Sequence, residues 1–363
     1  MKIVEVCGYY APHIGGIEYV AKNVAMELAA SGHEVTVLTS TIGSHSAGTV
    51  TNGRLKEVYL RGFEFAHTTF MPSLPIRLIK LDRNSMIHLH LSHVYTELTV
   101  FVIAKLRRIP YVAHYHMDVD TSGRFGFLYK AYKKALLPFV VRGANKLIAL
   151  SDEQRTILIQ RYGADPVDVT VVPNGVSDDY FLQKKRDFRR QPLRLLYLGR
   201  FAEQKNLSRL MKTMPLLTVP VELHLVGGGE KQAELEALVS RLDLKNVYFD
   251  GPKTGRGVVE AYRDADVFVL TSNREGMPLV LLEAAAAGLP IVASNVQGLR
   301  EFIRKNGVLV DHPSPETFAA VLNSILTDTQ ELERLSKAST KWAKAHTWSK
   351  LTKQIEQVLK DAR

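Results

Sequence analysis

The strongest constraint on the fold is an alternation along the whole chain of 363 residues, in which apolar runs of strand length are separated by amphipathic stretches of helix length. Runs that are apolar along their whole length are typical of parallel strands covered on both faces by helices. The expected strands lie at 3–6, 35–38, 87–90, 111–114, 147–150 and 169–172 in the first half, and at 193–198, 221–226, 247–249, 267–270, 291–294 and 308–310 in the second. The sequence therefore predicts an α/β protein with two parallel sheets of about six strands each.

The break between the halves is expected at Asp179–Pro192, because this segment is charged, lacks periodicity and ends in a proline. A chain of this length favours two domains, each with its own core. We expect an N-terminal domain over residues 1–180 and a C-terminal domain over residues 190–345. Ligands of doubly wound folds bind at the carboxyl ends of the strands, so the functional residues should lie in strand-to-helix loops that face a cleft between the domains.

Composition excludes several classes of protein. The single cysteine, Cys7, allows no intrachain disulfide and ends an apolar run, so we interpret it as a core residue. No apolar stretch reaches the length of a membrane span, so no membrane-spanning helix is expected. The N-terminus leads directly into a strand, so no signal peptide is expected. We therefore expect a cytoplasmic location. The formal net charge of +10 favours an anionic partner: nucleic acid, a phosphorylated small molecule or an anionic membrane surface.

The positive charge is concentrated between Thr121 and Ser151, a stretch without any acid. Lys130, Lys133 and Lys134 share one helix face by their spacing. The apolar residues that can share another face are Leu128, Tyr132, Leu136 and Phe139. Two interpretations stay open: a solvated face of a packed helix, or a surface that rests on the inner, anionic face of the cell membrane or on a membrane-embedded acceptor. A nucleic-acid binder should carry a longer basic stripe with interleaved aromatic residues, so nucleic acid is not an expected partner.

The first strand-to-helix loop, G-Y-Y-A-P-H-I-G-G-I-E at 8–18, places Gly15 and Gly16 directly before a helix. Paired glycines let the backbone approach a ligand, and the N–H groups of a helix start favour phosphate. A plain tight turn is the alternative. The dinucleotide fingerprint G-x-G-x-x-G is absent from the sequence, so a dinucleotide cofactor is not indicated.

Two loops of the second half carry charged residues. L-G-R-F-A-E-Q-K-N-L at 198–207 follows a strand and holds Arg200 and Lys205, two cations that suit a diphosphate, with a surface pair as the alternative. In E-G-M-P-L-V-L-L-E at 275–283, Pro278 fits the first turn of a helix that contains Glu283. Glu275 and Glu283 can accept hydrogen bonds from two different sugars of one ligand. The N–H groups of Gly276 and Met277 are expected to face its charged part.

Together these motifs resemble a known family. The Gly-Gly first loop, G-R-x-x-x-x-K, and E-G-x-P-x-x-x-x-E followed by A-x-A-x-G-x-P-I-V-A-S look like a retaining glycosyltransferase of the GT-B fold, of glycosyltransferase family 4. The resemblance covers almost the whole chain, including V-P-N-G-V at 172–176 and T-W-S at 347–349. It implies two doubly wound, Rossmann-like domains facing a cleft, and a C-terminal helix at 348–363 that crosses back to the N-terminal domain.

The resemblance also implies roles for single residues. Arg200 and Lys205 would hold the pyrophosphate of a sugar nucleotide, Glu275 would bind the transferred sugar, and Glu283 would bind the ribose hydroxyls. Further residues would contribute to the active site: Gly15 and Gly16 near the phosphates, Gly276, Met277, Pro278 and Leu279 in the donor site, and His116, in A-H-Y-H-M-D at 113–118, as the active-site histidine of the N-terminal domain.

A metal site is not predicted. The histidines to consider are His88, His90, His93, His114 and His116. We reason that strand alternation divides neighbouring residues between the two sheet faces, and the sequence offers no complete ligand set. The two D-x-D strings, at 118–120 and 264–266, do not fit the pattern of the glycosyltransferase fold that uses them to hold a metal. L-V-G-G-G-E at 225–230 is expected beside the nucleotide base or in a turn.

The sequence therefore predicts a retaining, metal-independent glycosyltransferase that uses a UDP-sugar or GDP-sugar as substrate and needs no cofactor. The expected acceptor is a hydroxyl of a lipid-linked or cell-envelope glycan at a membrane face. A GT-B-fold sugar-nucleotide 2-epimerase and a glycosyltransferase for a small soluble acceptor are the alternatives. A phosphorylase would need free phosphate, and usually a far longer chain or a cofactor lysine, and neither is evident.

Overall fold

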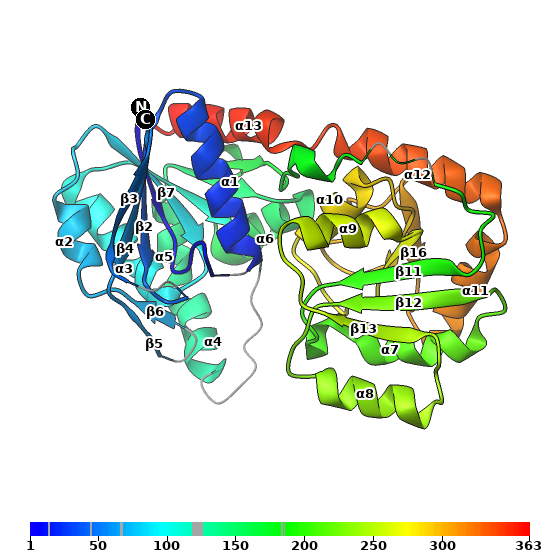
Figure 1. Cartoon of the computed structure of the whole chain (residues 1–363). Coiled ribbons are helices and arrows are strands. Elements are labelled where there is room, and N and C mark those ends of the chain that lie inside the picture. Colours follow the sequence, from blue (N-terminus) through cyan, green and yellow to red (C-terminus); the bar gives the residue numbers. More distant parts are fainter. Residues whose placement is uncertain (14, 44–45, 66–67, 118–125, 183, 185) are drawn as a thin grey trace. The chain divides into compact units, whose positions relative to one another are not determined.

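The computed structural model describes residues 1–13, 15–43, 46–65, 68–117, 126–182, 184 and 186–363. The chain divides into two compact units, residues 1–175 with 348–363 (unit 1) and residues 176–347 (unit 2). Each unit has its own central sheet with helices packed on it (Figure 1). The α/β class with two Rossmann-like domains is confirmed.

Unit 1 contains an eight-stranded sheet in the order β10-β9-β8-β7-β1-β2-β4-β3. Its strands are β1 (Lys2–Val6), β2 (Glu34–Ser40), β3 (Gly48–Asn52), β4 (Leu55–Leu60), β7 (Ser85–Leu91), β8 (Tyr111–Tyr115), β9 (Lys146–Ala149) and β10 (Val169–Val171). All strands expected in the first half are present. The strand order turns at β1 and β7, which are parallel neighbours, so their carboxyl ends form the switch point of this sheet.

The sequence missed the outer edge of this sheet. Strand β4 adds to β2, and β3 pairs with β4 in antiparallel orientation, so the expectation of a purely parallel sheet is wrong there. Every residue of β3 is exposed and β4 carries charged residues, so neither segment shows the apolar run of a buried strand. A separate hairpin is formed by β5 (Phe63–Phe65) and β6 (Thr68–Phe70).

The helices of unit 1 are α1 (Gly16–Ala30), α2 (Leu74–Ile79), α3 (Val94–Arg107), α4 (Gly126–Ala135), α5 (Leu137–Gly143), α6 (Asp152–Tyr162) and α13 (Trp348–Asp361). Helix α1 ends at Ser31-Gly32, with Gly32 at a φ of 92°. Helix α13 packs against α1 and so belongs to unit 1 (Figure 1). Cys7 is fully buried, which confirms it as a core residue.

Unit 2 contains a six-stranded, wholly parallel sheet in the order β13-β12-β11-β14-β15-β16. Its strands are β11 (Leu193–Leu198), β12 (Val221–Val226), β13 (Val247–Gly251), β14 (Val267–Leu270), β15 (Ile291–Ser294) and β16 (Gly307–Val310), as the apolar runs predicted. Its helices are α7 (Leu207–Thr213), α8 (Gln232–Arg241), α9 (Arg256–Asp264), α10 (Leu279–Ala286), α11 (Pro315–Leu326) and α12 (Thr329–Ala343). The strand order reverses between β11 and β14, where a doubly wound sheet binds its ligand.

The segment expected to be a linker is partly docked on unit 2. The guanidinium of Arg186 is buried and donates hydrogen bonds to the carbonyl oxygens of Tyr262, at 3.0 Å, and Ala287, at 2.8 Å. These carbonyls lie in the last turn of α9 and just beyond α10, where the helix dipole favours a cation. The sequence of this segment is charged and aperiodic and therefore predicts a linker. The hydrogen bonds of Arg186 with the two helix ends cannot be recognised from the sequence.

Candidate functional site

The two charged loops predicted from the sequence meet at the switch point of unit 2. Arg200 and Lys205 follow β11, and Glu275 follows β14, the strand that pairs with β11. Because the carboxyl ends of adjacent parallel strands share one sheet edge, these side chains gather there.

Lys205 and Glu275 are in direct contact. The Lys205 Nζ lies 2.7 Å from Glu275 Oε1, and the hydroxyl of Ser272 donates to the same oxygen at 2.6 Å. The Glu275 side chain is only 5% exposed, so this charge-assisted contact is shielded from water and fixes the carboxylate. The sequence assigned Lys205 and Glu275 to different parts of a ligand and did not foresee their contact or the role of Ser272.

Further hydrogen bonds tie the two loops together. The Gln204 amide donates to the carbonyl oxygen of Arg274 at 2.6 Å, and the backbone N–H of Asn273 donates to that of Gln204 at 2.8 Å. The hydroxyl of Thr271 donates to the carbonyl oxygen of Lys205 at 3.1 Å. Lys205 and Glu275 therefore stand on a braced pair of loops, a rigid support of the kind that a binding site needs.

Gly298 supports the Glu275 loop from the neighbouring strand connection. Glu275 donates its backbone N–H to the carbonyl oxygen of Gln297 at 3.1 Å, and Gly298 follows at a φ of 81°. A Cβ at Gly298 would collide with the carbonyl oxygen of Glu275 and lie 2.5 Å from that of Gly276. Only glycine therefore allows this approach of the backbones.

We expect Gly298→Ala to destabilise unit 2 and to weaken ligand binding at the Glu275 loop, because the added methyl must push that loop away. Gly251→Ala is the matched control, since Gly251 also has a positive φ, of 71°, but faces open space. The control should cost about 1 kcal/mol of unfolding free energy, the penalty of the left-handed backbone alone. Chemical denaturation of both variants measures the difference, and equal losses would contradict this role of Gly298.

Arg200 is the more accessible of the two cations. Its guanidinium is 73% exposed and lies 3.1 Å from Glu230, itself about half exposed. Such a surface pair is weak, so Arg200 can leave Glu230 for an anionic ligand. The glycines of 225–230 pack on this loop: Phe201 donates its backbone N–H to the carbonyl oxygen of Gly228 at 2.8 Å, and a Cβ at Gly229 would lie 2.6 Å from the carbonyl oxygen of Phe201.

Glu283 lies within α10 and is 8% exposed. The hydroxyl of Tyr262 donates to its Oε2 at 2.8 Å. Burial raises the pKa of the Glu283 carboxyl to about 7, although hydrogen bonds from Tyr262 and Tyr180 oppose the shift. A carboxyl that is half ionised at neutral pH, with few partners of its own, gains from hydroxyl donors supplied by a ligand.

The start of α10 differs by one residue from the prediction. Pro278 was expected in the first helical turn, but it has an extended ψ of 129° and precedes Leu279, the first helical residue. The fixed φ of proline suits both positions, so the sequence could not separate them. Met277 was predicted to bind the donor. Its side chain is buried and packs in the protein interior. Helix α10 ends at Ala287-Gly288, with Gly288 at a φ of 75°.

In unit 1, Gly15 and Gly16 stand at the start of α1 with an extended backbone at Gly15. A Cβ at Gly16 would meet open space, but a Cβ at Gly15 would collide with the carboxylate of Glu18, which therefore lies over the helix start. Beside it, His13 Nδ1 lies 3.2 Å from Glu18 Oε1, and the ring of Tyr9 stacks on His13 at 4.5 Å. The sequence did not single out these three neighbours of the glycine pair.

His116 follows β8 and is buried beside other histidines. Its Nε2 lies 2.9 Å from His90 Nδ1, and the Gln154 amide donates to its carbonyl oxygen at 3.0 Å. Burial lowers the pKa of His116 well below its usual range, so the imidazole is neutral at pH 7.

The histidines of β7 and β8 form a cluster, which the reasoning from strand alternation did not predict. Alternation separates consecutive residues, but residues two apart share a face, so His88 and His90 point the same way on β7. His114 on β8 lies opposite His90 in the sheet, and nitrogens of His88, His90 and His114 lie within 4.8 Å of one another.

The three lysines of α4 do not form one exposed face. Lys130 and Lys134 are exposed, but Lys133 is 7% exposed, with its ammonium 5.4 Å from the centre of the Tyr129 ring. Its charge also favours the ionised form of the buried Glu97, whose pKa burial raises to about 7. Lys133 is therefore buried beside Glu97 of α3 and is not part of an exposed basic face.

The apolar face predicted for this region is divided. Tyr132 is buried and its hydroxyl donates to Glu97. Leu136 and Phe139 are exposed, because α4 ends at Ala135 and a separate helix, α5, begins at Leu137. Phe127 is also exposed, and the Arg142 guanidinium lies 5.1 Å from the centre of the Phe139 ring. The side chain of Leu128 lies outside the described residues. The surface therefore mixes exposed aromatic and basic side chains.

Neither D-x-D string gives a described metal site. Residues 118–120 lie outside the described residues. In the string 264–266, Asp266 is buried, lies 3.0 Å from the guanidinium of Arg190 and accepts the backbone N–H of Arg194 at 2.8 Å. These contacts give Asp266 a structural role at the amino end of β11.

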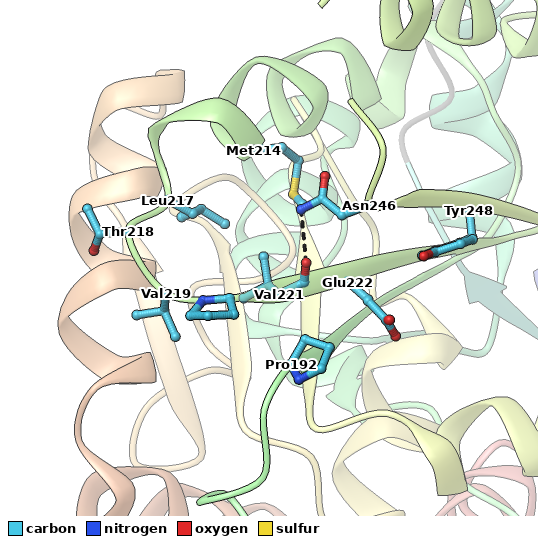
Figure 2. Close-up of a pocket in the computed structure, with 10 residues that line it drawn as sticks. Pro192, Met214, Leu217, Thr218, Val219, Val221, Glu222, Asn246 and Tyr248 are labelled. Atoms are coloured by element: carbon cyan, nitrogen blue, oxygen red, sulfur yellow. Dashed lines mark hydrogen bonds between the residues drawn. The ribbon is translucent and has the colours of Figure 1, made fainter. Parts of the chain in front are cut away.

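Figure 2 shows a pocket of about 470 Å³ in unit 2. Pro192, Val221 and Asn246, which help to line it, lie at the amino ends of β11, β12 and β13. It therefore opens at the edge of the sheet opposite to Lys205 and Glu275, and ligands of doubly wound sheets bind at the other edge.

Comparison with known proteins assigns the class. The model of Glycosyltransferase Family 4 matches residues 14–180, and that of Glycosyl transferases group 1 matches residues 179–342. HepE of Anabaena, in complex with UDP and glucose, has a TM-score of 0.77 at 19% identity, covering 99% of both chains. WaaG, a glycosyltransferase involved in lipopolysaccharide biosynthesis, has a TM-score of 0.68 at 18% identity, covering 98% of this chain and 99% of its own. The fold is thus that of the GT-B glycosyltransferases.

Sequence relatives agree with this class. An uncharacterised glycosyltransferase of Methanocaldococcus jannaschii is 28% identical over 395 aligned positions, covering 100% of this chain and 98% of the relative. A D-inositol 3-phosphate glycosyltransferase of Geodermatophilus obscurus is 34% identical over 233 positions, covering 58% of this chain and 51% of the relative. The chain belongs to the family 4 type of glycosyltransferases and is a transferase of sugars, as its motifs predicted.

Proposed function

We propose that this chain is a retaining glycosyltransferase that moves a sugar from a UDP-sugar or GDP-sugar to a hydroxyl acceptor. The observation that carries the proposal is the braced contact of Lys205, Glu275 and Ser272 at the switch point of unit 2. The neighbour HepE is described with UDP and with UDP-glucose, which favours a UDP-sugar as the first donor to test.

The proposed chemistry breaks the bond between the anomeric carbon and a phosphate oxygen. The leaving nucleoside diphosphate gains negative charge, which Arg200, Lys205 and the N-terminal end of α10 offset without a metal ion at the diphosphate. Glu275 accepts hydroxyls of the transferred sugar, and Glu283 accepts those of the ribose. The donor site between Glu275 and Glu283 is formed by Gly276, Met277, Pro278 and Leu279.

Unit 1 contributes the proposed acceptor side. Gly15 and Gly16 offer a helix start to a phosphate that displaces the Glu18 carboxylate, and His116 offers a neutral imidazole. A neutral imidazole can contact the sugar or form a hydrogen bond with the acceptor hydroxyl. A glycosyltransferase needs an acceptor for turnover, whereas a sugar-nucleotide 2-epimerase would convert the donor alone.

The experiment takes purified protein and screens UDP-, GDP- and ADP-sugars by thermal shift. A ligand at a hundred times its Kd should stabilise the protein by about 2.7 kcal/mol. The stabilising donor is then incubated without added divalent metal, with and without a glycan acceptor, and the products are identified. Sugar transfer only in the presence of acceptor, with the anomeric configuration kept, is expected. An altered donor sugar formed without acceptor would replace this proposal by the epimerase.

For the acceptor, we propose a lipid-linked or cell-envelope glycan reached from the membrane surface. Among the described residues, every helix is too short or too polar to span a bilayer. The exposed Lys130 and Lys134 stand beside exposed aromatic residues, Phe127 and Phe139, and this combination suits an anionic headgroup layer. A soluble acceptor is the second candidate, because one relative is named for D-inositol 3-phosphate.

Charge reversal of Lys130 and Lys134 to glutamate should weaken binding to anionic vesicles by at least about thirtyfold, since each lysine near such a surface contributes about 1 kcal/mol. The matched control reverses Lys337 and Lys341, an exposed pair with the same spacing on α12. Co-sedimentation at low salt measures the effect. The same loss in both variants, or in neither, would favour the soluble acceptor.

A further inference from the structure

A group of buried polar side chains in unit 1 has no part in the proposed transfer. It consists of Glu5 on β1, His88 and His90 on β7, and His114 on β8. Glu5 lies opposite His88 in the sheet, and His90 lies opposite His114. Because residues two apart share a face, all four side chains lie on one face of three adjacent strands.

These side chains leave an unusual number of polar atoms without a partner. Each residue is at most 1% exposed. Among the described residues, His88 Nε2 and both nitrogens of His114 have no partner, and Glu5 Oε2 and His90 Nε2 have only each other, at 3.5 Å. A buried polar atom without a partner costs about 1–3 kcal/mol, so a cluster of this size needs something to satisfy it.

The unpartnered atoms converge. His88, His90 and His114 each offer a nitrogen within 4.8 Å of the others, and Glu5 Oε2 lies 3.5 Å from His90 Nε2. A tetrahedral zinc ion has ligand bonds of about 2.0–2.2 Å to nitrogen and oxygen, so the three histidine nitrogens would close in on the ion, and Glu5 would reach it from beside His90.

We propose that His88, His90, His114 and Glu5 bind one divalent transition-metal ion, zinc in the first instance. Three imidazoles and a carboxylate are the ligand types that zinc accepts, and a set of four closes the tetrahedron without an open position. The ion would also give the buried carboxylate of Glu5 the positive partner that it requires. In the competing arrangement no ion is bound, and Glu5 is held by its contacts with His88, whose Nδ1 lies 3.3 Å from Glu5 Oε1, and with His90.

The geometry around this set is that of an oriented metal site. Binding through His90 Nε2 leaves the proton of His90 on Nδ1, which faces His116 Nε2 at 2.9 Å. Metal-bound histidines in proteins are oriented by such a hydrogen bond from the other nitrogen. The ion would therefore fix the ring of His90 and, through it, that of His116, while the diphosphate chemistry of unit 2 stays free of metal.

The test uses the full chain, purified without a metal-affinity step, and measures its metal content by elemental analysis after equilibration with zinc. We expect about one zinc per chain in the wild type. His114→Phe, which keeps a ring of similar size, should lower this content more than tenfold. His224→Phe is the matched control, because His224 also lies on a strand, stacks on Tyr248 and contacts Asp250, and it should retain the zinc.

Two further measurements keep the test decisive if His114→Phe fails to fold. Wild-type apoprotein titrated with cobalt(II) should develop the visible absorption of a tetrahedral site, and added zinc should raise its Tm. His116→Leu, which has no acceptor for the N–H of His90, should weaken zinc binding by about 10–100-fold, the usual effect of losing an orienting partner. A wild type that takes up no zinc and no cobalt, or a His114→Phe variant with full zinc content, would overturn the proposal in favour of the metal-free contacts of Glu5 with His88 and His90.

Discussion

Replacing Glu275 by alanine should lower the turnover number by about a hundredfold to a thousandfold, the usual cost of removing a positioned group that acts in the transition state. Glu275 is held by Lys205 and Ser272, so its carboxylate is oriented before the donor arrives. The affinity for free nucleoside diphosphate should stay the same or rise, because Lys205 loses its intramolecular partner and its whole charge becomes available to the diphosphate. Steady-state kinetics gives the turnover number, and calorimetry gives the affinity.

Glu283→Ala is the matched comparison within the same motif. Its proposed partners are the ribose hydroxyls, which remain in the product, so this change should weaken the binding of the nucleoside diphosphate itself. Ser272→Ala should lower turnover less than Glu275→Ala, since Ser272 touches only the carboxylate. The same loss of nucleotide affinity in the variants of Glu275 and Glu283 would refute the division of roles.

The parts of this fold that could be predicted are those written in local patterns. Strands β14 and β15 of unit 2 are buried at every residue because helices cover both faces, so their positions follow from the apolar pattern alone. Strand β3 could not be found in this way, because an exposed edge strand such as G-T-V-T-N needs no apolar side chains. Its position is set by pairing with β4, a contact that no local pattern records.

The site divides in the same manner. The loops after β11 and β14 could be named because function gathers at the carboxyl ends of parallel strands. The contact of Lys205 with Glu275 joins residues 70 positions apart, and the collision that requires glycine at 298 involves the carbonyl of another loop. Lys133 was misplaced for a related reason: helical spacing records which residues share a face, but not that Glu97 of a neighbouring helix lies buried beside that face.

Glu283→Gln should stabilise the ligand-free protein at pH 8 and weaken its binding of nucleotide. Burial raises the pKa of the Glu283 carboxyl to about 7 in the folded state, against an ordinary value of 4.5. The folded state therefore binds more protons than the unfolded state between these two values. The stability that this group contributes is highest below the lower pKa and falls as the pH rises through 7.

The size of the effect follows from the same shift. Each pKa unit corresponds to 1.36 kcal/mol, so ionising Glu283 in the folded protein costs about 3 kcal/mol above pH 7. Glutamine keeps an acceptor for the Tyr262 hydroxyl and carries no charge, so the variant should be more stable than the wild type by about that amount at pH 8. Most of the difference should vanish by pH 5. Glu97, whose pKa is raised alike, is present in both proteins and cancels in the comparison.

Nucleotide binding should show the opposite preference. Ribose hydroxyls donate to the ionised carboxylate, so bound nucleotide favours the form that is scarce below pH 7. Between pH 6 and pH 8 the ionised fraction rises about tenfold, and the wild-type affinity for nucleoside diphosphate should rise with it. Glu283→Gln should lose this dependence, apart from the part that comes from the phosphates themselves, which the variant measures directly.

Chemical denaturation at pH 5 and pH 8, with calorimetry at pH 6 and pH 8, measures both effects. The control is Glu236→Gln, an exposed residue of α8, which should change neither property with pH. A variant that is no more stable at pH 8 would mean that the folded protein does not raise the pKa of Glu283. A variant that is more stable yet binds nucleotide as well as the wild type would mean that the buried carboxyl is not a ribose ligand. If both expected results are found, the free energy lost by burying Glu283 in the empty protein is recovered when the ribose binds, which is how binding sites commonly trade stability for function.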